Sequence, residues 1–206
     1  SKLCLNLSKK NYKISIICIG KCGYSKIFKK NNIRVYELNS KKLIFSIFLI
    51  SNLLKKIVKK KYKNILISNI HYNNVILTLI AKRINNLKTV LVERTPLEEL
   101  DIYFSNIDYL KKKILKFLVN LVYPLSDIII ANSVGIKKGF NNSLLNKVKV
   151  IYPPSLDKLN KSTKKIPKKN VFKAVCFSRL SKEKNLECAI KSFVLIKKKN
   201  ISLTIF

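Results

Sequence analysis

The stretch Phe177-Ser178-Arg179-Leu180-Ser181-Lys182-Glu183-Lys184-Asn185 decides how the rest of the chain is interpreted. It follows an apolar run at residues 174–177 and precedes an amphipathic run at residues 186–196, which predicts a strand, a short loop and a helix. Arg179 and Lys184 would then lie where the strand ends and the helix begins. Open α/β sheets bind ligands at this edge, and a helix N-terminus favours anions. The stretch therefore indicates either a diphosphate site or a solvated loop in a lysine-rich chain.

Short apolar runs alternate with amphipathic runs along the first 154 residues. Strands are expected at 12–19, 33–38, 65–68, 89–92, 127–131 and 148–151. Helices are expected at 24–30, 42–61, 75–84, 109–123 and 134–140, with loops at 69–74 and 97–108. This alternation predicts an α/β fold, with a mostly parallel sheet and helices on both faces. The Lys-, Ser- and Pro-rich stretch 155–170 is expected to be an interdomain linker before a new β-α-β unit at 171–206.

Polar residues follow three of these expected strands. His71 follows 65–68, Glu93 and Arg94 follow 89–92, and Asn132-Ser133 follow 127–131. Each would lie at the ligand-facing edge of the sheet. A structural interpretation stands beside each functional one. His71 can be a structural or merely exposed histidine, and Glu93 and Arg94 can pair with each other or with nearby lysines. Asn132-Ser133 is better explained as the cap of the next helix.

The charge balance is extreme, with 43 Lys and Arg against 10 Asp and Glu and a formal net charge of +33. Nucleic acid or an anionic membrane surface would suit such a field. Because the lysines are spread over the whole chain, an AT-rich genome, whose codons favour lysine, explains them better than a binding surface does. The 5 cysteines form no C-x-x-C pair, which disfavours a disulfide framework or zinc site and favours a reducing compartment. The sequence contains no P-loop, G-x-G-x-x-G, G-x-S-x-G, helix-turn-helix or RNP motif.

Two segments raise the question of membrane contact. An apolar stretch at 43–54 runs into the lysines of 55–61, and 111–119 mixes lysines with apolar residues. Both are shorter than the roughly 20 residues that a membrane-spanning helix needs. Each can pack on a sheet, or lie on an anionic membrane surface with its lysines on the headgroups.

The order of four segments resembles the retaining glycosyltransferases of family 4, which have the two-domain GT-B architecture. Residues 5–16 resemble the family's first helix and second strand, and Ile129-Ile130-Ala131-Asn132-Ser133 resembles its "ANS" strand end. Val148-Lys149-Val150-Ile151-Tyr152-Pro153-Pro154 resembles the exit into the second domain, with Pro153 in place of the usual Asn. Residues 177–185 resemble the "G-R-L-S-x-E-K-N" loop, with Ser178 in place of Gly. The resemblance covers nearly the whole chain.

The resemblance implies an arrangement of domains and a set of site residues. Residues 1–154 would be an N-terminal, Rossmann-like, acceptor-side domain without its first strand, and 171–206 the start of the nucleotide-sugar-binding domain. Ser178, Arg179 and Lys184 would hold the donor diphosphate, and the two cations would stabilise the leaving group without a metal or another cofactor. His71 would be catalytic, near the transferred sugar, and the acceptor side would comprise Glu93, Arg94, Asn132 and Ser133.

The implied function is transfer of a hexose from a UDP- or GDP-sugar to a glycan or lipid-linked acceptor, in cell-surface polysaccharide or glycolipid synthesis. The expected location is the cytoplasm, with peripheral contact at the inner face of the plasma membrane. The alternative is a non-catalytic basic protein that binds nucleic acid or an anionic membrane, with nucleic acid the less favoured partner.

The absence of methionine indicates a fragment. Since the resemblance expects a Gly-rich loop before Ser1 and a glutamate pair after Phe206, residues 1–206 alone are expected to be inactive.

Overall fold

The computed structural model describes residues 2–40, 43–153, 172–181, 184–196 and 201–206. The chain divides into two compact units, Ser1–Ser155 and Leu156–Phe206, and each is described by itself. The linker predicted at 155–170 lies outside the described residues.

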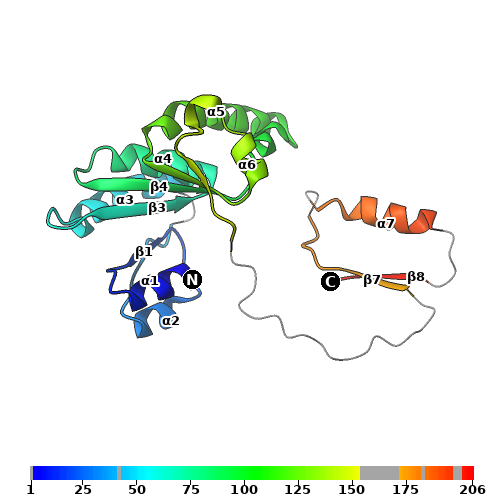
Figure 1. The fold of residues 1–206 in the computed structure, drawn as a ribbon, viewed down its shortest axis with the longest axis horizontal. Helices are drawn as coiled ribbons and strands as arrows, with labels where there is room; N and C mark the ends of the chain where they lie inside the picture. Colours follow the sequence, from blue (N-terminus) through cyan, green and yellow to red (C-terminus); the bar gives the residue numbers. More distant parts are fainter. Residues whose placement is uncertain (1, 41–42, 154–171, 182–183, 197–200) are drawn as a thin grey trace. The chain divides into compact units, whose positions relative to one another are not determined.

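The first unit is built from parallel strands and the helices that connect them (Figure 1). Its strands are β1 (Ser15–Cys18), β2 (Arg34–Glu37), β3 (Asn64–Asn69), β4 (Leu87–Glu93), β5 (Ile128–Ala131) and β6 (Val148–Val150). Its α-helices are α1 (Lys2–Lys9), α2 (Ser25–Lys30), α3 (Leu43–Ile57), α4 (His71–Ala81), α5 (Asn106–Val122) and α6 (Val134–Lys138). Its short 3₁₀ helices are η1 (Leu97–Asp101), η2 (Tyr123–Leu125) and η3 (Asn142–Leu144). The expected α/β class is confirmed.

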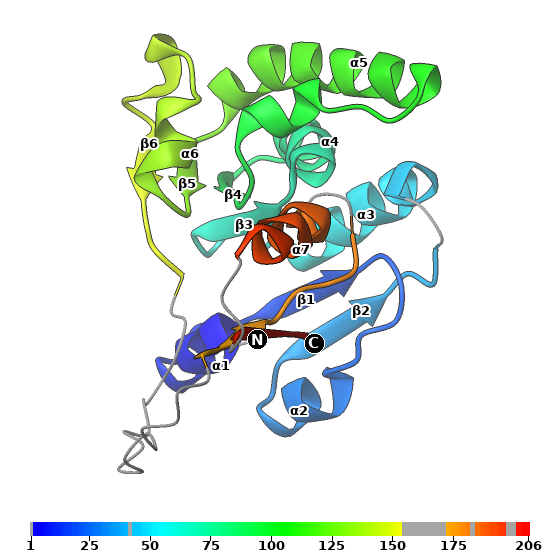
Figure 2. The ribbon, with the colours of Figure 1, turned by 90° about the vertical axis from the view of Figure 1, so that its right-hand side faces the viewer.

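Every strand pair within the described residues is parallel, as expected. The strands do not join into one sheet within those residues, because β1 and β2 pair apart from the sheet of order β3-β4-β5-β6. The three helices α3, α4 and α5 lie side by side, with α4 in contact with both neighbours (Figure 2). Because the strands of the four-stranded sheet are parallel, they all end at the same edge, where the connections to the helices begin.

The main core lies between α5 and the four-stranded sheet. Leu115, Val119 and Val122 recur at helical spacing along α5 and are buried against Leu91 and Ile129 of the sheet. A second cluster joins α3 and α4 to both sheets, through Ile50, Leu54 and Ile80 with partly buried residues such as Ile17, Leu38 and Leu66. No helix in the described ranges has the length and hydropathy needed to cross a membrane.

Two helices begin earlier than the sequence predicts. The predicted loop at 69–74 is wrong, because α4 begins at His71. The predicted loop at 97–108 is also wrong in part, because η1 covers Leu97–Asp101 and α5 begins at Asn106. The Ser105 hydroxyl accepts a hydrogen bond from the Asp108 backbone N–H at 3.2 Å and so caps α5.

Asparagine takes the left-handed backbone positions that glycine usually takes. Positive φ angles occur at Ile70 and, among the other described non-glycine residues, at Asn11, Asn32, Asn39, Asn86 and Asn185. Asparagine tolerates this region because its short polar side chain bonds locally. A chain with only 4 glycines thus still forms tight turns.

The second unit contains β7 (Phe172–Cys176), α7 (Leu186–Leu195) and β8 (Ile201–Ile205). β7 and β8 pair in parallel, with Cys176 opposite Ile205. The strand, loop and helix predicted around residues 177–185 are therefore confirmed. The rings of Phe177 and Phe206 stack with their centroids 5.0 Å apart at the end of these strands.

Candidate functional site

A strained turn places His71 at the carboxyl edge of the four-stranded sheet. β3 ends at Asn69, and α4 begins only two residues later. Ile70 between them has φ 76° and ψ 137°, a conformation that β-branched residues rarely adopt. Such strain costs about 1–3 kcal/mol and is concentrated at functional sites. The turn directs the chain from the sheet edge straight into the first turn of α4.

Glu93 ends the neighbouring strand and faces His71. β4 pairs with β3 in a register that sets Val92 opposite Asn69, so Glu93 emerges beside the turn. The carboxylate Oε2 lies 3.0 Å from Nδ1 of His71. Glu93 is fully buried and His71 is 5% exposed. The interpretations of His71 as an exposed histidine and of Glu93 as a partner of Arg94 or a lysine are therefore wrong, because the two side chains contact each other inside the unit.

The second carboxylate oxygen, Oε1, accepts two hydrogen bonds. Asn74 Nδ2 donates at 2.6 Å, and the hydroxyl of Tyr123 donates as well. The amide of Asn74 is held in turn by the Ser68 hydroxyl, which donates to Oδ1 at 2.5 Å. Burial, and then the charge of Glu93 beside it, raise the pKa of Tyr123 well above its usual range, so its hydroxyl keeps the proton that it donates.

These contacts offset the free-energy cost of burying the Glu93 carboxylate. A buried charge is costly unless it is paired and hydrogen-bonded. Oε1 has its two donors, while Oε2 accepts no hydrogen bond within the described part of the chain and faces the imidazole. In the tautomer that carries its proton on Nδ1, that N–H lies beside the carboxylate and Nε2 is the lone-pair nitrogen. Nε2 lies 3.3 Å from the hydroxyl of Thr95, on the exposed segment after β4. The arrangement can orient a histidine that accepts a proton or a hydrogen bond on its outer side.

The remaining residues predicted for the acceptor side have different environments. Arg94 is exposed and directly follows Glu93. The backbone N–H of Asn132 donates to the Glu93 carbonyl at 3.1 Å, so Asn132 lies at the same sheet edge. Ser133 caps α6, because its hydroxyl accepts from the Ile136 N–H at 3.2 Å, as the structural interpretation predicted.

The predicted diphosphate residues lie on one loop of the second unit. Ser178, Arg179 and Lys184 follow β7 and precede α7. The Ser178 N–H donates to Phe206 O at 3.0 Å, which ties the loop to the end of β8. Arg179 and Lys184 are exposed, and the structure shows no acidic side chain paired with either of them among the residues it describes. Their predicted role as diphosphate ligands stays a prediction.

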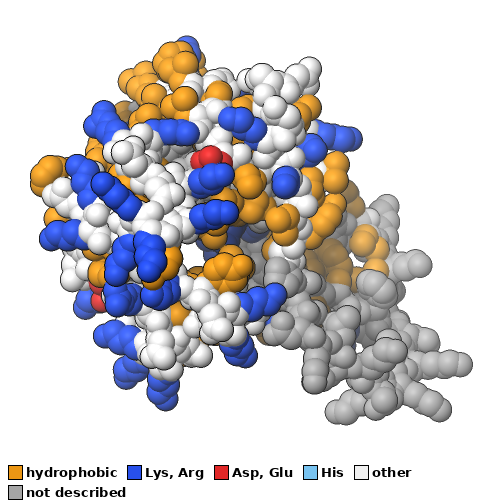
Figure 3. Space-filling view, turned by 60° about the vertical axis from the view of Figure 1, so that its left-hand side comes forward, with side chains coloured by type: hydrophobic (Ala, Val, Ile, Leu, Met, Phe, Trp, Pro, Cys, Tyr) orange, Lys and Arg blue, Asp and Glu red, His pale blue; other side chains and the backbone are white. Residues whose placement is uncertain are grey.

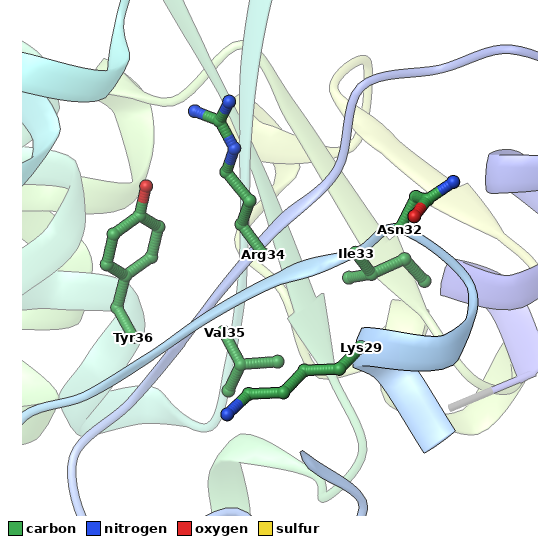
Figure 4. Close-up of a pocket in the computed structure, with 6 residues that line it drawn as sticks. All are labelled: Lys29, Asn32, Ile33, Arg34, Val35 and Tyr36. Atoms are coloured by element: carbon green, nitrogen blue, oxygen red, sulfur yellow. The ribbon is translucent and has the colours of Figure 1, made fainter. Parts of the chain in front are cut away.

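Most side chains of the candidate site are buried. One hollow, of about 550 Å³, instead lies along the edge strand β2 and is lined by residues 29 and 32–36. There Arg34 and Tyr36 extend to one side of the strand and Val35 to the other (Figure 4). None of the predicted site residues lines it. Among the described residues, no cluster of three or more His, Cys, Asp or Glu side chains could hold a metal ion.

Sequence reasoning missed four members of the polar cluster: Ser68, Asn74, Thr95 and Tyr123. Asn74 lies three residues after His71, which is one helical turn once α4 is known to begin at His71. Tyr123 is 52 residues away from His71 in sequence, and no local pattern links the two.

Comparison with known proteins gives similarity at the level of fold. No family model and no curated protein matches the sequence. The structure of Anabaena HepE, solved with UDP and glucose, matches with a TM-score of 0.63 at 17% identity, over 98% of this chain and 56% of HepE. MurG of Acinetobacter baumannii matches with a TM-score of 0.49 at 11% identity, over 100% of this chain and 61% of MurG. The lipopolysaccharide outer core galactosyltransferase WaaB also gives 0.49, at 14% identity, over 94% and 60% of the two chains. The chain spans little more than half the length of HepE, and over that span it has the GT-B type of α/β fold.

Proposed function

We propose that this chain is part of a retaining glycosyltransferase of family 4, which transfers a hexose from a UDP- or GDP-sugar to a glycan or lipid-linked acceptor. The observation that carries the proposal is the buried Glu93–His71 pair at the carboxyl edge of a parallel sheet with the GT-B fold. A buried histidine that contacts a buried carboxylate at the ligand-binding edge of an α/β sheet is well placed to act on a bound substrate. The HepE structure with UDP and glucose supports a nucleotide-sugar donor.

In this proposal the two units have separate tasks. Arg179 and Lys184 bind the donor diphosphate and stabilise the negative charge that develops on it as the sugar departs. Ser178 contributes its backbone and hydroxyl to the same loop. His71 presents Nε2 toward the transferred sugar, with Glu93 holding its orientation. Arg94, Asn132 and Ser133 lie on the acceptor side, and no metal or other cofactor takes part in the chemistry.

The proposal is tested by titrating UDP and GDP into the full-length protein in a calorimeter. Arg179→Ala and Lys184→Ala should each weaken nucleotide binding about tenfold or more, because each removes a charge-assisted hydrogen bond. Lys191→Ala is the matched control, since it removes an exposed lysine from α7 in the same unit. His71→Asn should slow sugar transfer while nucleotide affinity stays near the wild-type value.

Wild-type nucleotide affinity in both Arg179→Ala and Lys184→Ala would contradict the proposal. If polyanion binding then fell steeply with salt and ignored both changes, the non-catalytic basic protein would be the better description.

A further inference from the structure

Two cysteines contact each other at the carboxyl end of β1. Cys18 is the last residue of this strand, and Cys22 lies in the loop that leads to α2. A hydrogen bond joins their thiols. Both are free thiols on half-buried residues, so neither cysteine is sealed inside the core. The structure thus brings together two oxidisable groups that the candidate site does not use.

Glu37 holds the second cysteine beside the first. β1 and β2 pair in parallel, with Cys18 opposite Glu37 where both strands end (Figure 2). Oε1 of Glu37 accepts a hydrogen bond from the Cys22 backbone N–H at 2.9 Å. The Cys18 carbonyl accepts another from the Leu38 N–H, also at 2.9 Å. The end of β2 therefore binds both sides of the loop and keeps the two sulfur atoms close together.

The loop that carries Cys22 has room to move. Two thiols that form a disulfide must approach until their sulfur atoms are about 2.05 Å apart. Gly20 and Gly23 lie in this loop, and a Cβ added to either would meet no heavy atom within 4 Å among the described residues, its chain neighbours aside. Both glycines are exposed, as is Lys21. The loop can therefore adjust without displacing packed side chains.

We propose that Cys18 and Cys22 are a site of reversible oxidation, at which a low-molecular-weight disulfide such as oxidised glutathione converts the two thiols into a disulfide. The cysteine pattern of the chain favours a reducing compartment, where disulfides are usually transient and serve redox sensing or catalysis. The new bond closes the loop at the carboxyl edge of β1, the edge at which open α/β sheets bind ligands. This inference is independent of the proposed sugar transfer, because the exchange requires neither donor nor acceptor.

The exchange proceeds in two steps. Cys22 attacks as a thiolate and forms a mixed disulfide with one half of oxidised glutathione, while the other half leaves and takes up the proton that Cys22 has lost. Cys18 then attacks the sulfur of Cys22, and the second glutathione leaves with the proton of Cys18. Two electrons pass from the protein to the reagent, and the products are one protein disulfide and two molecules of reduced glutathione.

The environment of Cys18 sets the order of these steps. Burial first, and then contact with Cys22 and the charge of Glu37, raise the pKa of the Cys18 thiol to about 11. Because the thiolate is the nucleophile, Cys18 is unreactive at neutral pH and the first attack falls to Cys22. Once Cys22 is held in the mixed disulfide, it no longer raises the pKa of Cys18, and the second step can follow.

Basic side chains favour the approach of this reagent. Oxidised glutathione carries a net negative charge at neutral pH, and the exposed Lys21 directly precedes Cys22. Figure 3 shows one face of the molecule, on which Lys and Arg side chains are spread widely and acidic ones are few. Such a field raises the local concentration of anions.

Two other interpretations of the pair fit less well. Structural cysteines are inert because they are buried, whereas Cys18 and Cys22 are both half-buried. A zinc site needs further His, Cys or carboxylate ligands besides two thiols. The described part of the chain contains no group of three such side chains that could hold a metal ion.

The test is oxidation of the full-length protein in buffers of reduced and oxidised glutathione, followed by blocking of the free thiols with N-ethylmaleimide, tryptic digestion and mass spectrometry. Trypsin cleaves after Lys13, Lys21 and Lys26, which leaves Cys18 in peptide 14–21 and Cys22 in peptide 22–26. A disulfide between the two peptides should appear in the wild type and disappear on treatment with dithiothreitol. The ratio of linked to unlinked peptides should be about tenfold or more higher in the folded protein than in protein unfolded in urea, because only the fold holds the thiols in contact.

Three single variants test the order of the steps. Cys18→Ser should stop at a mixed disulfide of glutathione on peptide 22–26. Cys22→Ser should lose the linked peptides and leave Cys18 largely unmodified. Cys188→Ser is the matched control, because it removes an exposed cysteine from α7 and should leave the linkage of the other two peptides unchanged. Circular dichroism checks that each variant folds, and the wild-type measurement does not depend on any of them.

The proposal is overturned if oxidised glutathione leaves the two wild-type peptides unlinked, or links them equally well in folded and unfolded protein. Linkage of either cysteine to Cys188 as readily as to its neighbour would also overturn it. A mixed disulfide that forms on Cys18 in Cys22→Ser as fast as on Cys22 in Cys18→Ser would contradict the assigned order of attack.

Discussion

Replacing Tyr123 with Phe removes one donor from the buried carboxylate and leaves the packing nearly unchanged. The Tyr123 hydroxyl donates to Oε1 of Glu93, and the tyrosine is fully buried. The ring centroids of Tyr123 and Phe140 lie 6.2 Å apart, and a phenylalanine at position 123 would preserve this contact. A hydrogen bond to a charged acceptor contributes about 1.5–3 kcal/mol, so we expect Tyr123→Phe to cost about 2 kcal/mol. In a unit of this size, that lowers the melting temperature by about 4–8 °C.

The assay is urea unfolding followed by far-ultraviolet circular dichroism, read on the transition of the first unit. The urea midpoint should fall while the slope of the transition stays constant. Tyr109→Phe is the matched control, because Tyr109 is exposed and its hydroxyl has a neighbouring Lys113 nitrogen at 3.4 Å. We expect that change to stay within about 0.5 kcal/mol of wild type.

A double-mutant cycle separates the hydrogen bond from the loss of an oxygen atom. In a Glu93→Gln background the acceptor is neutral, so Tyr123→Phe should cost about 1 kcal/mol less than it does beside the carboxylate. The reasoning is refuted if Tyr123→Phe matches the control, or if its cost is the same in both backgrounds. Either result would mean that the Tyr123 hydroxyl does not stabilise the negative charge of Glu93.

Two further predictions concern the backbone and pH. Ile70→Gly should stabilise the first unit by about 1 kcal/mol, because glycine adopts the positive φ at this turn without strain; a lower urea midpoint than wild type would contradict this. Burial alone would raise the pKa of Asp127, but hydrogen bonds from the N–H and hydroxyl of Thr89, at 2.8 and 3.1 Å, and the charges of Lys82 and Lys88 lower it below 3.8. Since the folded-state pKa is the lower one, this stabilisation is present above about pH 4 and is lost as the pH falls through the folded pKa. Wild type should therefore lose stability in acid faster than Asp127→Asn, and parallel curves in urea titrations at several pH values would refute the assignment.

Much of the fold follows from local sequence. The apolar runs that predict β3, β4 and β5 are short and continuous, and the amphipathic runs between them predict the helices. The loop around Arg179 was equally predictable, since strand, loop and helix signals follow one another without a gap. Helix starts were harder to place. The sequence predicted a loop around His71 because nothing in Ile70 indicates a positive φ.

Only some residues of the candidate site could be predicted from the sequence. His71 and Glu93 could be selected because polar residues at strand ends collect at one sheet edge. Their partners could not, because Asn74 depends on where α4 begins and Tyr123 reaches the cluster from the far end of α5. For the same reason the sequence suggested Arg94 or a lysine as the partner of Glu93, since those residues are close along the chain.

The sequence by itself determined the α/β alternation, the polar residues at strand ends and the two cations of the loop at 177–185, because all of these depend on neighbours within a few residues. Only the tertiary structure decided that Glu93 is buried against His71 and Tyr123, and that Leu115, Val119 and Val122 of α5 pack in the main core. Burial and pairing depend on which distant segments the fold brings together, and a local pattern cannot specify that.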